Sequence, residues 1–330
     1  MQTEEEGDYK MREIPYILAI NEALAEEMER DEAVFIIGED VQSGVFGASR
    51  GLVERFGPER IMDTPLSETA VAGAAIGAAM AGYRPIADFM FADFMLIAAN
   101  EIINNAAKWH FIHGGKVALP LVLFGNIGGG ARVGPEHSQC PESIFMHTPG
   151  LKVVVPSTAY DAKGLLKTAI RDNNPVVFFY HKRLLGLPGE VPEEEYTIPL
   201  GVADVKREGK DVTVVATSNM VKLSLDVAEE LKDKVSVEIV DPRTLEPLDI
   251  STIVESVKKT GRVVIVDEDT KRCSVSAEIG MQIMEQAFDS LDAPIQRVCT
   301  ANLPVAGAYM EQYVLPQPKD IVAAIEAVTA

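Results

Sequence analysis

Short, wholly apolar runs that alternate with segments of helical spacing constrain the fold of this chain more than any other feature. Helical spacing is clear at Ile17, Ile20, Leu24 and Met28, and again over residues 161–172. The apolar runs are rich in valine, isoleucine and phenylalanine, and in the first half of the chain they occupy residues 34–38, 84–90, 119–125, 151–156 and 175–180. Apolar strands that alternate with helices are typical of a parallel sheet covered on both faces.

A break in this alternation divides the chain into two units. Residues 186–201 are rich in proline, glycine and acids, which predicts an interdomain linker. Beyond it the alternation resumes, with strands expected at 211–217, 235–241, 262–268 and 294–300 and helices at 222–232, 249–260 and 274–289. The sequence therefore predicts two α/β domains, 11–190 and 202–330, preceded by a disordered extension over residues 1–10.

The charge balance argues against several classes of protein. The 330 residues include 50 acidic and 30 basic side chains, which gives a net charge of −20. A chain this acidic repels polyphosphate, so we expect no nucleic-acid binding. Apolar residues make up 47% of the chain, which is too many for a disordered protein.

Cysteine spacing and hydropathy predict where such a chain works. Cys140, Cys273 and Cys299 are far apart and form no Cys-x-x-Cys pair, which indicates a reducing compartment rather than a disulfide framework or a zinc site. The longest apolar stretch, residues 70–81, is shorter than the about 20 residues that span a bilayer. We expect a cytoplasmic protein with no membrane contact.

Several glycine patterns invite a functional interpretation. Residues 47–51 (GASRG) match the nucleophile elbow G-x-S-x-G, but they follow a loop-like segment, so we interpret the match as coincidental. Residues 125–134 lack both the lysine of a phosphate loop and the spacing G-x-G-x-x-G. We expect them to form an active-site loop with unusual backbone angles. Gly73 and Gly77 share a helix face and predict close helix packing, within the chain or against another subunit.

Two ionisable residues stand out, each with two interpretations. Glu68 lies in the first turn of a predicted helix, where it either stabilises the helix N-terminus or acts as a catalytic carboxylate. His137 follows the glycine-rich loop, where it either exchanges protons or is simply solvated. His110, His113 and His181 are expected to be ordinary surface or helix-end residues.

Several long motifs occur together in the order and spacing of one family. They are MREIPYILAINEAL, GEDV, DTPLSETAVAGAAIGAAMAGYRPIADFMFADF, GPEHSQ, HTPGLKVVVPSTAYDAKGLLKTAIRDNNPVV and DPRTLEPLD. From Met11 onward the chain closely resembles the beta subunit of the thiamine-diphosphate-dependent first component of 2-oxo acid dehydrogenase complexes, a family that includes pyruvate, branched-chain and acetoin dehydrogenases. The resemblance implies a parallel-sheet pyrimidine-binding domain followed by a smaller α/β domain of the transketolase C-terminal type.

The resemblance also implies roles for single residues. Glu68 matches the glutamate that bonds N1′ of the cofactor's aminopyrimidine and so favours the imino tautomer, which accepts the proton of the thiazolium carbon. Phe94 matches an aromatic residue that packs on the pyrimidine, and Met90 belongs to the same region. His137 matches the histidine that guides acyl transfer to a lipoyl group.

Two metals and a partner subunit follow from the same resemblance. A structural potassium ion is implied at the backbone carbonyls of Leu121, Ala169, Ile170, Asp172 and Asn174. Magnesium in such enzymes is held by a Gly-Asp-Gly sequence, which this chain lacks. We therefore expect an alpha subunit to supply magnesium and to bind the diphosphate in an α₂β₂ heterotetramer, and we expect this chain alone to be inactive.

The implied function is oxidative decarboxylation of a 2-oxo acid, or the corresponding reaction of acetoin, with acyl transfer to a lipoylated dihydrolipoyl acyltransferase core. The sequence leaves the substrate open. The second domain is expected to serve mainly in assembly, with acidic surface near the C-terminus meeting a basic domain of the core. Two alternatives are half of a split transketolase-type enzyme that acts on sugar phosphates, and a non-catalytic assembly subunit.

Overall fold

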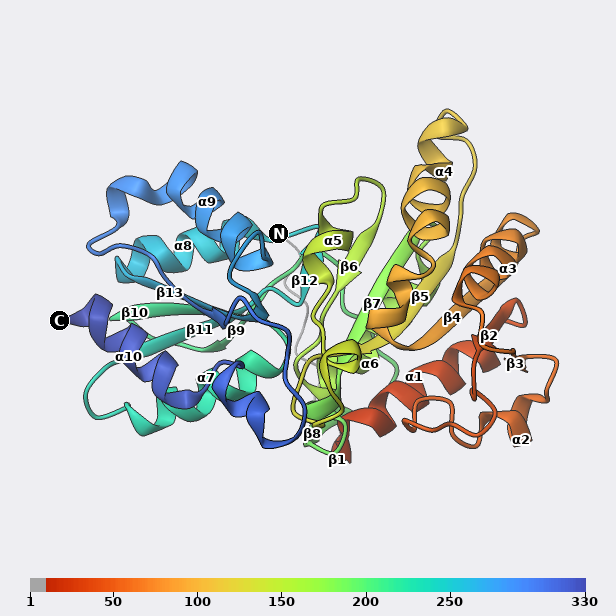
Figure 1. Cartoon of the computed structure of the whole chain (residues 1–330), viewed down its shortest axis with the longest axis horizontal. Coiled ribbons are helices and arrows are strands. Elements are labelled where there is room, and N and C mark those ends of the chain that lie inside the picture. The colour runs from red at the N-terminus through yellow and green to blue at the C-terminus, as the bar shows by residue number, and fades with distance from the viewer. Residues whose placement is uncertain (1–9) are drawn as a thin grey trace.

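A seven-stranded sheet is the frame of the first unit in the computed structural model, which describes residues 10–330 (Figure 1). In spatial order its strands are β12 (Thr244–Glu246), β6 (Lys152–Val154), β7 (Pro175–His181), β5 (Leu121–Ile127), β4 (Arg84–Phe91), β2 (Val34–Gly38) and β3 (Ile61–Asp63). All are parallel except the edge strand β12, which pairs antiparallel with β6. The predicted parallel sheet is confirmed.

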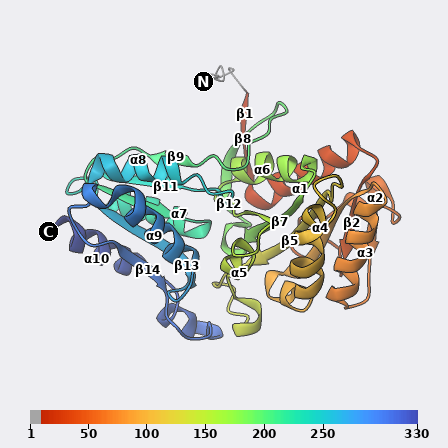
Figure 2. The same cartoon turned by 90° about the horizontal axis from the view of Figure 1, so that it is seen from above.

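Helices cover both faces of this sheet (Figure 2). One face carries α1 (Tyr16–Arg30) and α6 (Ala159–Arg171), and the other carries α3 (Glu68–Met80), a π-helical segment (Asn100–Ala106) and α4 (Ala107–Ile112). Neighbouring strand residues serve the two cores alternately, since Phe124 belongs to the core under α1 and α6 and Leu123 to the core under α3. Burial on both faces explains why the strands are apolar at every position.

A five-stranded sheet forms the second unit, in the order β14 (Gln296–Thr300), β13 (Val263–Thr270), β10 (Val212–Ala216), β11 (Val237–Asp241) and β9 (Asp204–Arg207). Only β9 runs antiparallel to its neighbour. One face is covered by α7 (Asn219–Glu230) and α10 (Pro318–Thr329), and the other by α8 (Ile250–Thr260) and α9 (Val275–Ala287). None of the helices in residues 10–330 is long and apolar enough to cross a membrane.

The two units share structure as well as a boundary. Strand β12 comes from the second half of the chain and completes the first sheet. The core beneath α3 also continues into the second unit, where it includes Val215, Val240 and Ile253. Side chains of the second unit are therefore in a position to act on the first.

The segment expected to link the domains, residues 186–201, is partly a strand. In it β8 (Pro188–Pro192) pairs antiparallel with β1 (Met11–Pro15). This pairing was not predicted, because the prolines and glycines of the segment are poor strand formers. Of the expected N-terminal extension, residues 1–9 lie outside the described residues, and Lys10 forms an ion pair with Glu193 at 2.8 Å.

Short helical turns complete the chain, several of them at strand ends. They are α2 (Leu52–Phe56), α5 (Glu142–Met146) and the 3₁₀ turns η1 (Ala92–Leu96), η3 (Pro135–His137), η4 (Lys182–Leu184), η5 (Phe288–Ser290) and η6 (Ala308–Tyr313).

The glycine face of α3 is open. No other atom of the described chain lies within 4 Å of the place where a β-carbon would stand on Gly73 or Gly77. The expectation that another helix of this chain packs there is wrong, because both glycines face outward. The alternative, a contact with another subunit, stays a prediction.

Candidate active site

The expected site residues follow the ends of neighbouring parallel strands. Glu68 opens α3 after β3, Phe94 lies in η1 after β4, and His137 ends η3 after β5. Met90 is the penultimate residue of β4. Because the carboxyl ends of parallel strands meet at one edge of a sheet, the topology gathers these four residues at a single edge.

His137 lies against two phenylalanine rings. Its ring centroid is 4.6 Å from that of Phe91 and 5.3 Å from that of Phe94, edge-on in both cases. The two phenylalanine rings are 6.0 Å apart. His137 Nδ1 is buried and has no hydrogen-bond partner among the described residues. The structure thus brings His137 and Phe94 together.

Glu68 is half-buried at the start of α3, and the preceding Ser67 makes no capping hydrogen bond. Burial, Asp40 and Glu68 together raise the pKa of Glu39, which follows β2. Three carboxylates are therefore close neighbours at this edge.

A bulge in β4 sets the position of Met90. The register between β4 and β5 shifts after Asp88, and Met90 takes a left-handed φ of 58° with its N–H donating to Asp88 Oδ1 at 2.8 Å. Burial raises the pKa of Asp88 to about 7. Met90 lines a small pocket together with Glu39, so it lies beside the carboxylates around Glu68.

Lys182, which follows β7 at the same edge, was not among the predicted site residues. Its Nζ lies 5.3 Å from the centroid of the Phe91 ring and donates to Asn126 Oδ1 at 3.2 Å. Burial lowers the pKa of Lys182. The signal that could have found it is positional, because it directly follows an apolar strand of the parallel sheet.

Asp93 fixes the chain just beyond His137. Its Oδ1 accepts hydrogen bonds from the Gln139 backbone at 3.1 Å and from the Gln139 side chain at 2.9 Å. Burial raises the pKa of Asp93. The segment that carries His137 is therefore anchored on its C-terminal side by η1.

The prediction that His181 is an ordinary surface or helix-end residue is wrong. It is the last residue of β7, it is buried, and its Nε2 lies 3.1 Å from Glu268 Oε2. Its Nδ1 accepts the Arg183 N–H at 3.0 Å, so Nε2 is the nitrogen that donates to Glu268. Glu268 belongs to the second unit, and no local pattern could show this long-range burial. His110 and His113 are exposed as predicted.

The elbow pattern at residues 47–51 is coincidental, as predicted. Ser49 is buried, and its hydroxyl donates to the carbonyl oxygen of Val41 at 2.6 Å. A hydroxyl committed to this contact is not exposed as a nucleophile.

The residues expected to hold potassium lie near the opposite edge of the sheet. Leu121 begins β5, Ala169 and Ile170 lie in the last turn of α6, and Asp172 and Asn174 lie in the turn between α6 and β7. Arg84 Nη1 donates to the carbonyl oxygens of Ile170 at 2.8 Å and Asp172 at 3.0 Å. Lys152 also pairs with the Asp172 carboxylate. Each of these two carbonyl oxygens keeps a second lone pair, so the residues fit a cation. The positive charges of Arg84 and Lys152 already lie at the same place.

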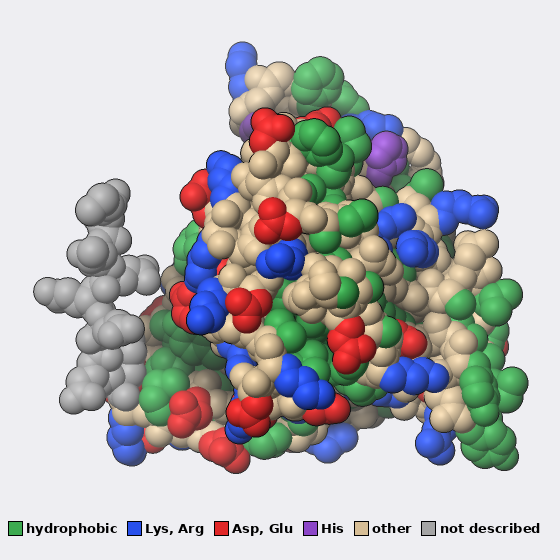
Figure 3. Space-filling model, turned by 90° about the vertical axis from the view of Figure 1, so that its left-hand side faces the viewer, with side chains coloured by type: hydrophobic (Ala, Val, Ile, Leu, Met, Phe, Trp, Pro, Cys, Tyr) green, Lys and Arg blue, Asp and Glu red, His purple; other side chains and the backbone are tan. Residues whose placement is uncertain are grey.

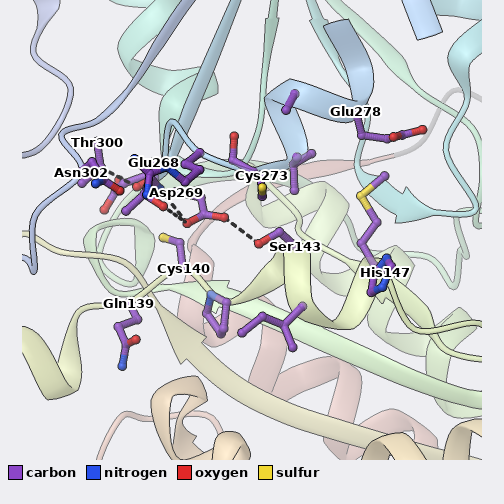
Figure 4. A pocket seen from close by; sticks show the side chains of 18 of the residues that line it. Gln139, Cys140, Ser143, His147, Glu268, Asp269, Cys273, Glu278, Thr300 and Asn302 are labelled. Carbon is purple, nitrogen blue, oxygen red and sulfur yellow. Dashed lines mark hydrogen bonds between the residues drawn. The ribbon is translucent and has the colours of Figure 1, made fainter. Parts of the chain in front are cut away.

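A cavity of about 1590 Å³ lies between the two units, next to the segment that carries His137 (Figure 4). Gln139, Cys140 and Ser143 line it from the first unit, and Glu268 and Asp269 from the second. Ser143 Oγ donates to Asp269 Oδ2 at 2.8 Å across the boundary. The second unit therefore forms one wall beside the candidate site.

Comparison with known proteins defines the class first. Residues 12–188 match the family "Transketolase, pyrimidine binding domain", and residues 201–321 match "Transketolase, C-terminal domain". A solved structure titled "Split gene transketolase, inactive beta4 tetramer" superposes with a TM-score of 0.78 at 24% identity, over 96% of this chain and 98% of that one. At this identity the likeness shows the fold alone. The chain has the two-domain architecture of the transketolase type.

Curated relatives define the family within that class. The chain is 49% identical to the 2-oxoisovalerate dehydrogenase subunit beta of Bacillus subtilis, over 96% of this chain and 98% of the relative. It is 47% identical to the acetoin:2,6-dichlorophenolindophenol oxidoreductase subunit beta of Cupriavidus necator (95% and 96%) and 46% identical to the pyruvate dehydrogenase E1 component subunit beta of Rickettsia felis (94% and 96%). The chain belongs to the family of beta subunits of the thiamine-diphosphate-dependent first component of 2-oxo acid and acetoin dehydrogenases.

Proposed function

We propose that this chain forms the pyrimidine-binding half of the active site of a thiamine-diphosphate-dependent dehydrogenase, with a 2-oxo acid or acetoin as substrate. The observation that carries the proposal is the convergence of Glu68, Met90, Phe94 and His137 at one strand edge. The acyl product would pass to a lipoylated acyltransferase core. The relatives are named for 2-oxoisovalerate, acetoin and pyruvate, and the proposed substrate class covers all three.

The residues present fit the aminopyrimidine and its reaction. When bound, thiamine diphosphate supplies the nucleophilic carbon and the electron sink that decarboxylation needs. Glu68, which lies close to Glu39, would bond the pyrimidine nitrogen N1′ and share its proton. Phe94 and Met90 would hold the ring by apolar contact. His137, with Nδ1 unpartnered, would hold or deliver a proton where the acyl group leaves.

We propose that the magnesium ion and the diphosphate are bound by an alpha subunit in an α₂β₂ assembly. Large apolar side chains are exposed on the α3 side of the sheet, among them Leu66 before α3, Ile97 after η1 and Phe111 in α4, of which Phe111 is 87% exposed. The open glycine face of α3 lies on the same side of the sheet. Such surface on a folded chain favours a protein partner.

We propose that the acyltransferase core contacts the charged surface of the second unit. On the face of the second unit that Figure 3 shows, acidic and basic side chains are interspersed rather than separated. Within the second unit, Lys222 forms an ion pair with Asp226 in α7, and Lys258 forms one with Glu255 in α8. The net charge of −20 would therefore act mainly as a long-range attraction for a basic domain.

Potassium at the turn between α6 and β7 stays a prediction, with Arg84 as a competing source of positive charge. Thermal unfolding in potassium chloride and in choline chloride at equal ionic strength tests it. A bound ion predicts a higher midpoint in potassium, and equal midpoints would indicate that Arg84 and Lys152 suffice.

Co-expression with the partner alpha chain tests the proposed function. Purified complex would be assayed with pyruvate, branched 2-oxo acids, acetoin and sugar phosphates, using an artificial electron acceptor, and titrated with thiamine diphosphate by calorimetry. We expect cofactor binding and turnover of a 2-oxo acid or acetoin. Turnover of sugar phosphates alone would favour the transketolase alternative, and absence of cofactor binding would favour an assembly subunit.

A further inference from the structure

The backbone of the glycine-rich loop after β5 is fixed mainly by hydrogen bonds to side chains of the second unit. Gly128, Gly130, Arg132 and Gly134 all take left-handed φ values, of 84°, 93°, 63° and 94°. Backbone N–H groups in such a loop converge on a common acceptor, as they do around bound anions. Here the N–H groups of Gly129, Gly130 and Arg132 donate to side chains of the second unit, while the Gly128 N–H donates to the Gln139 carbonyl oxygen at 3.0 Å.

Two buried carboxylates receive these N–H groups. Glu311, in η6, accepts from the Gly130 N–H at 3.0 Å and from the Arg132 N–H at 2.8 Å, and its side chain is only 4% exposed. Glu268, at the end of β13, accepts from the Gly129 N–H at 2.7 Å. Since the Gly129, Gly130 and Arg132 N–H groups all donate to these two carboxylates, the described loop presents no cluster of free N–H groups to a phosphate.

Both carboxylates are themselves fixed. Although burial would raise it, the contacts with His181 and with the Gly129 N–H hold the pKa of Glu268 at about 2. The backbone of η6 adds a second tie to the loop, since the Ala308 N–H donates to the Arg132 carbonyl at 3.4 Å. Leu315 fills the space where a β-carbon on Gly129 would stand.

This loop leads directly into η3, which ends at His137. Upstream of His137 the chain is held by Glu311 at Arg132, and downstream it is held by Asp93 at Gln139. We propose that Glu311, supported by Glu268, is a positioning residue that places His137 for acyl transfer, so the second domain takes part in the reaction as well as in assembly. The role in acyl transfer rests on the proposed function, whereas the anchoring of the loop does not.

The test uses the α₂β₂ holoenzyme with Glu311→Gln, which keeps the size of the side chain but removes its charge and one acceptor. Glu326→Gln, an exposed acid on α10, is the matched control. Turnover with an artificial acceptor is compared with acyl transfer to a lipoylated domain. We expect the ratio of acyl transfer to acceptor turnover to fall about tenfold in E311Q and to stay unchanged in E326Q.

A double variant separates positioning from general damage. If Glu311 acts through His137, then the double variant with E311Q and His137→Ala has the same ratio of acyl transfer to acceptor turnover as the single variant H137A. A further fall in the double variant, or an unchanged ratio in E311Q with wild-type turnover, would overturn the proposal while leaving the proposed function intact.

Amide hydrogen exchange keeps the proposal testable if E311Q does not fold or if no substrate is turned over. In the wild-type holoenzyme the Gly130 and Arg132 amides should exchange at least tenfold more slowly than the Ala131 amide, for which the described residues offer no acceptor. Equal exchange at all three amides would contradict the anchoring itself.

Discussion

At the scale of single residues, Asp88 is a buried carboxyl group next to a strained backbone position. It accepts the N–H of Met90, whose φ is 58°, and burial raises the pKa of Asp88 to about 7. Unfolding returns the carboxyl group to its ordinary, lower pKa. Between roughly pH 4 and pH 7 the unfolded chain is therefore ionised where the folded chain is protonated, so the free energy of unfolding falls as the pH rises.

Asp88→Asn should remove this pH dependence, because asparagine carries no proton to lose and still accepts the Met90 N–H. We expect the free energy of unfolding of D88N, relative to wild type, to rise by about 2 kcal/mol between pH 5 and pH 7. Urea unfolding at the two pH values measures it. The exposed Asp289→Asn is the control, and a parallel pH dependence of D88N and wild type would contradict the assignment.

At the residue scale, the sequence can single out positions that follow a local pattern, while the roles of these residues stay predictions. Glu68 opens a helix and His137 follows a glycine-rich loop, so both could be singled out without a structure. His181 and Glu311 could not, because each matters through a contact between the two units, more than 80 residues apart along the chain.

At the scale of elements, α1 and α6 are joined by buried ion pairs. Lys163 and Lys167 of α6 are each 1% exposed, and both pair with Glu26 of α1 at 2.7 Å. Although burial would raise it, the hydrogen bonds from Lys163 and Lys167 lower the pKa of Glu26. One half-exposed carboxylate thus helps to neutralise two buried ammonium groups.

The two sides of this contact should respond unequally to substitution. Glu26→Gln leaves two buried charges with less compensation, and we expect it to lower the free energy of unfolding by about 3 kcal/mol. Lys167→Met replaces one buried charge with an apolar side chain of similar size and should cost about 1 kcal/mol or less. Urea unfolding at neutral pH compares the two, and a larger loss in K167M than in E26Q would contradict this account.

Element-scale prediction was best for the strands of the parallel sheet. Runs such as residues 34–38 and 175–180 are apolar throughout because helices bury both faces, and this makes them visible in a sequence. Strand β8 escaped prediction because Pro188, Gly189 and Pro192 are poor strand formers, and its partner β1 lies at the other end of the first unit.

At the scale of the whole molecule, the open glycine face of α3 is the clearest sign that the chain works in an assembly. Gly73→Leu and Gly77→Leu meet no atom of the described chain within 4 Å at the β-carbon, and leucine favours a helix over glycine by about 1 kcal/mol. We expect both variants to fold with at least wild-type stability but to fail to form the α₂β₂ complex. Light scattering after size-exclusion chromatography measures the assembly.

The exposed Ala323→Leu on α10 is the control for added apolar surface. If the α3 variants assemble as well as A323L and wild type, then this face is not a subunit contact. Loss of folded monomer in the α3 variants would contradict the prediction that this face tolerates larger side chains.

In the proposed function, Glu68 is the carboxylate that would activate thiamine diphosphate. Turnover of the reconstituted α₂β₂ enzyme with Glu68→Gln tests it most directly, with the exposed Glu326→Gln as control. We predict that E68Q assembles normally but loses on the order of 10²- to 10³-fold in kcat, as expected when one transition-state contact is removed. Turnover of E68Q within twofold of wild type would contradict the claim.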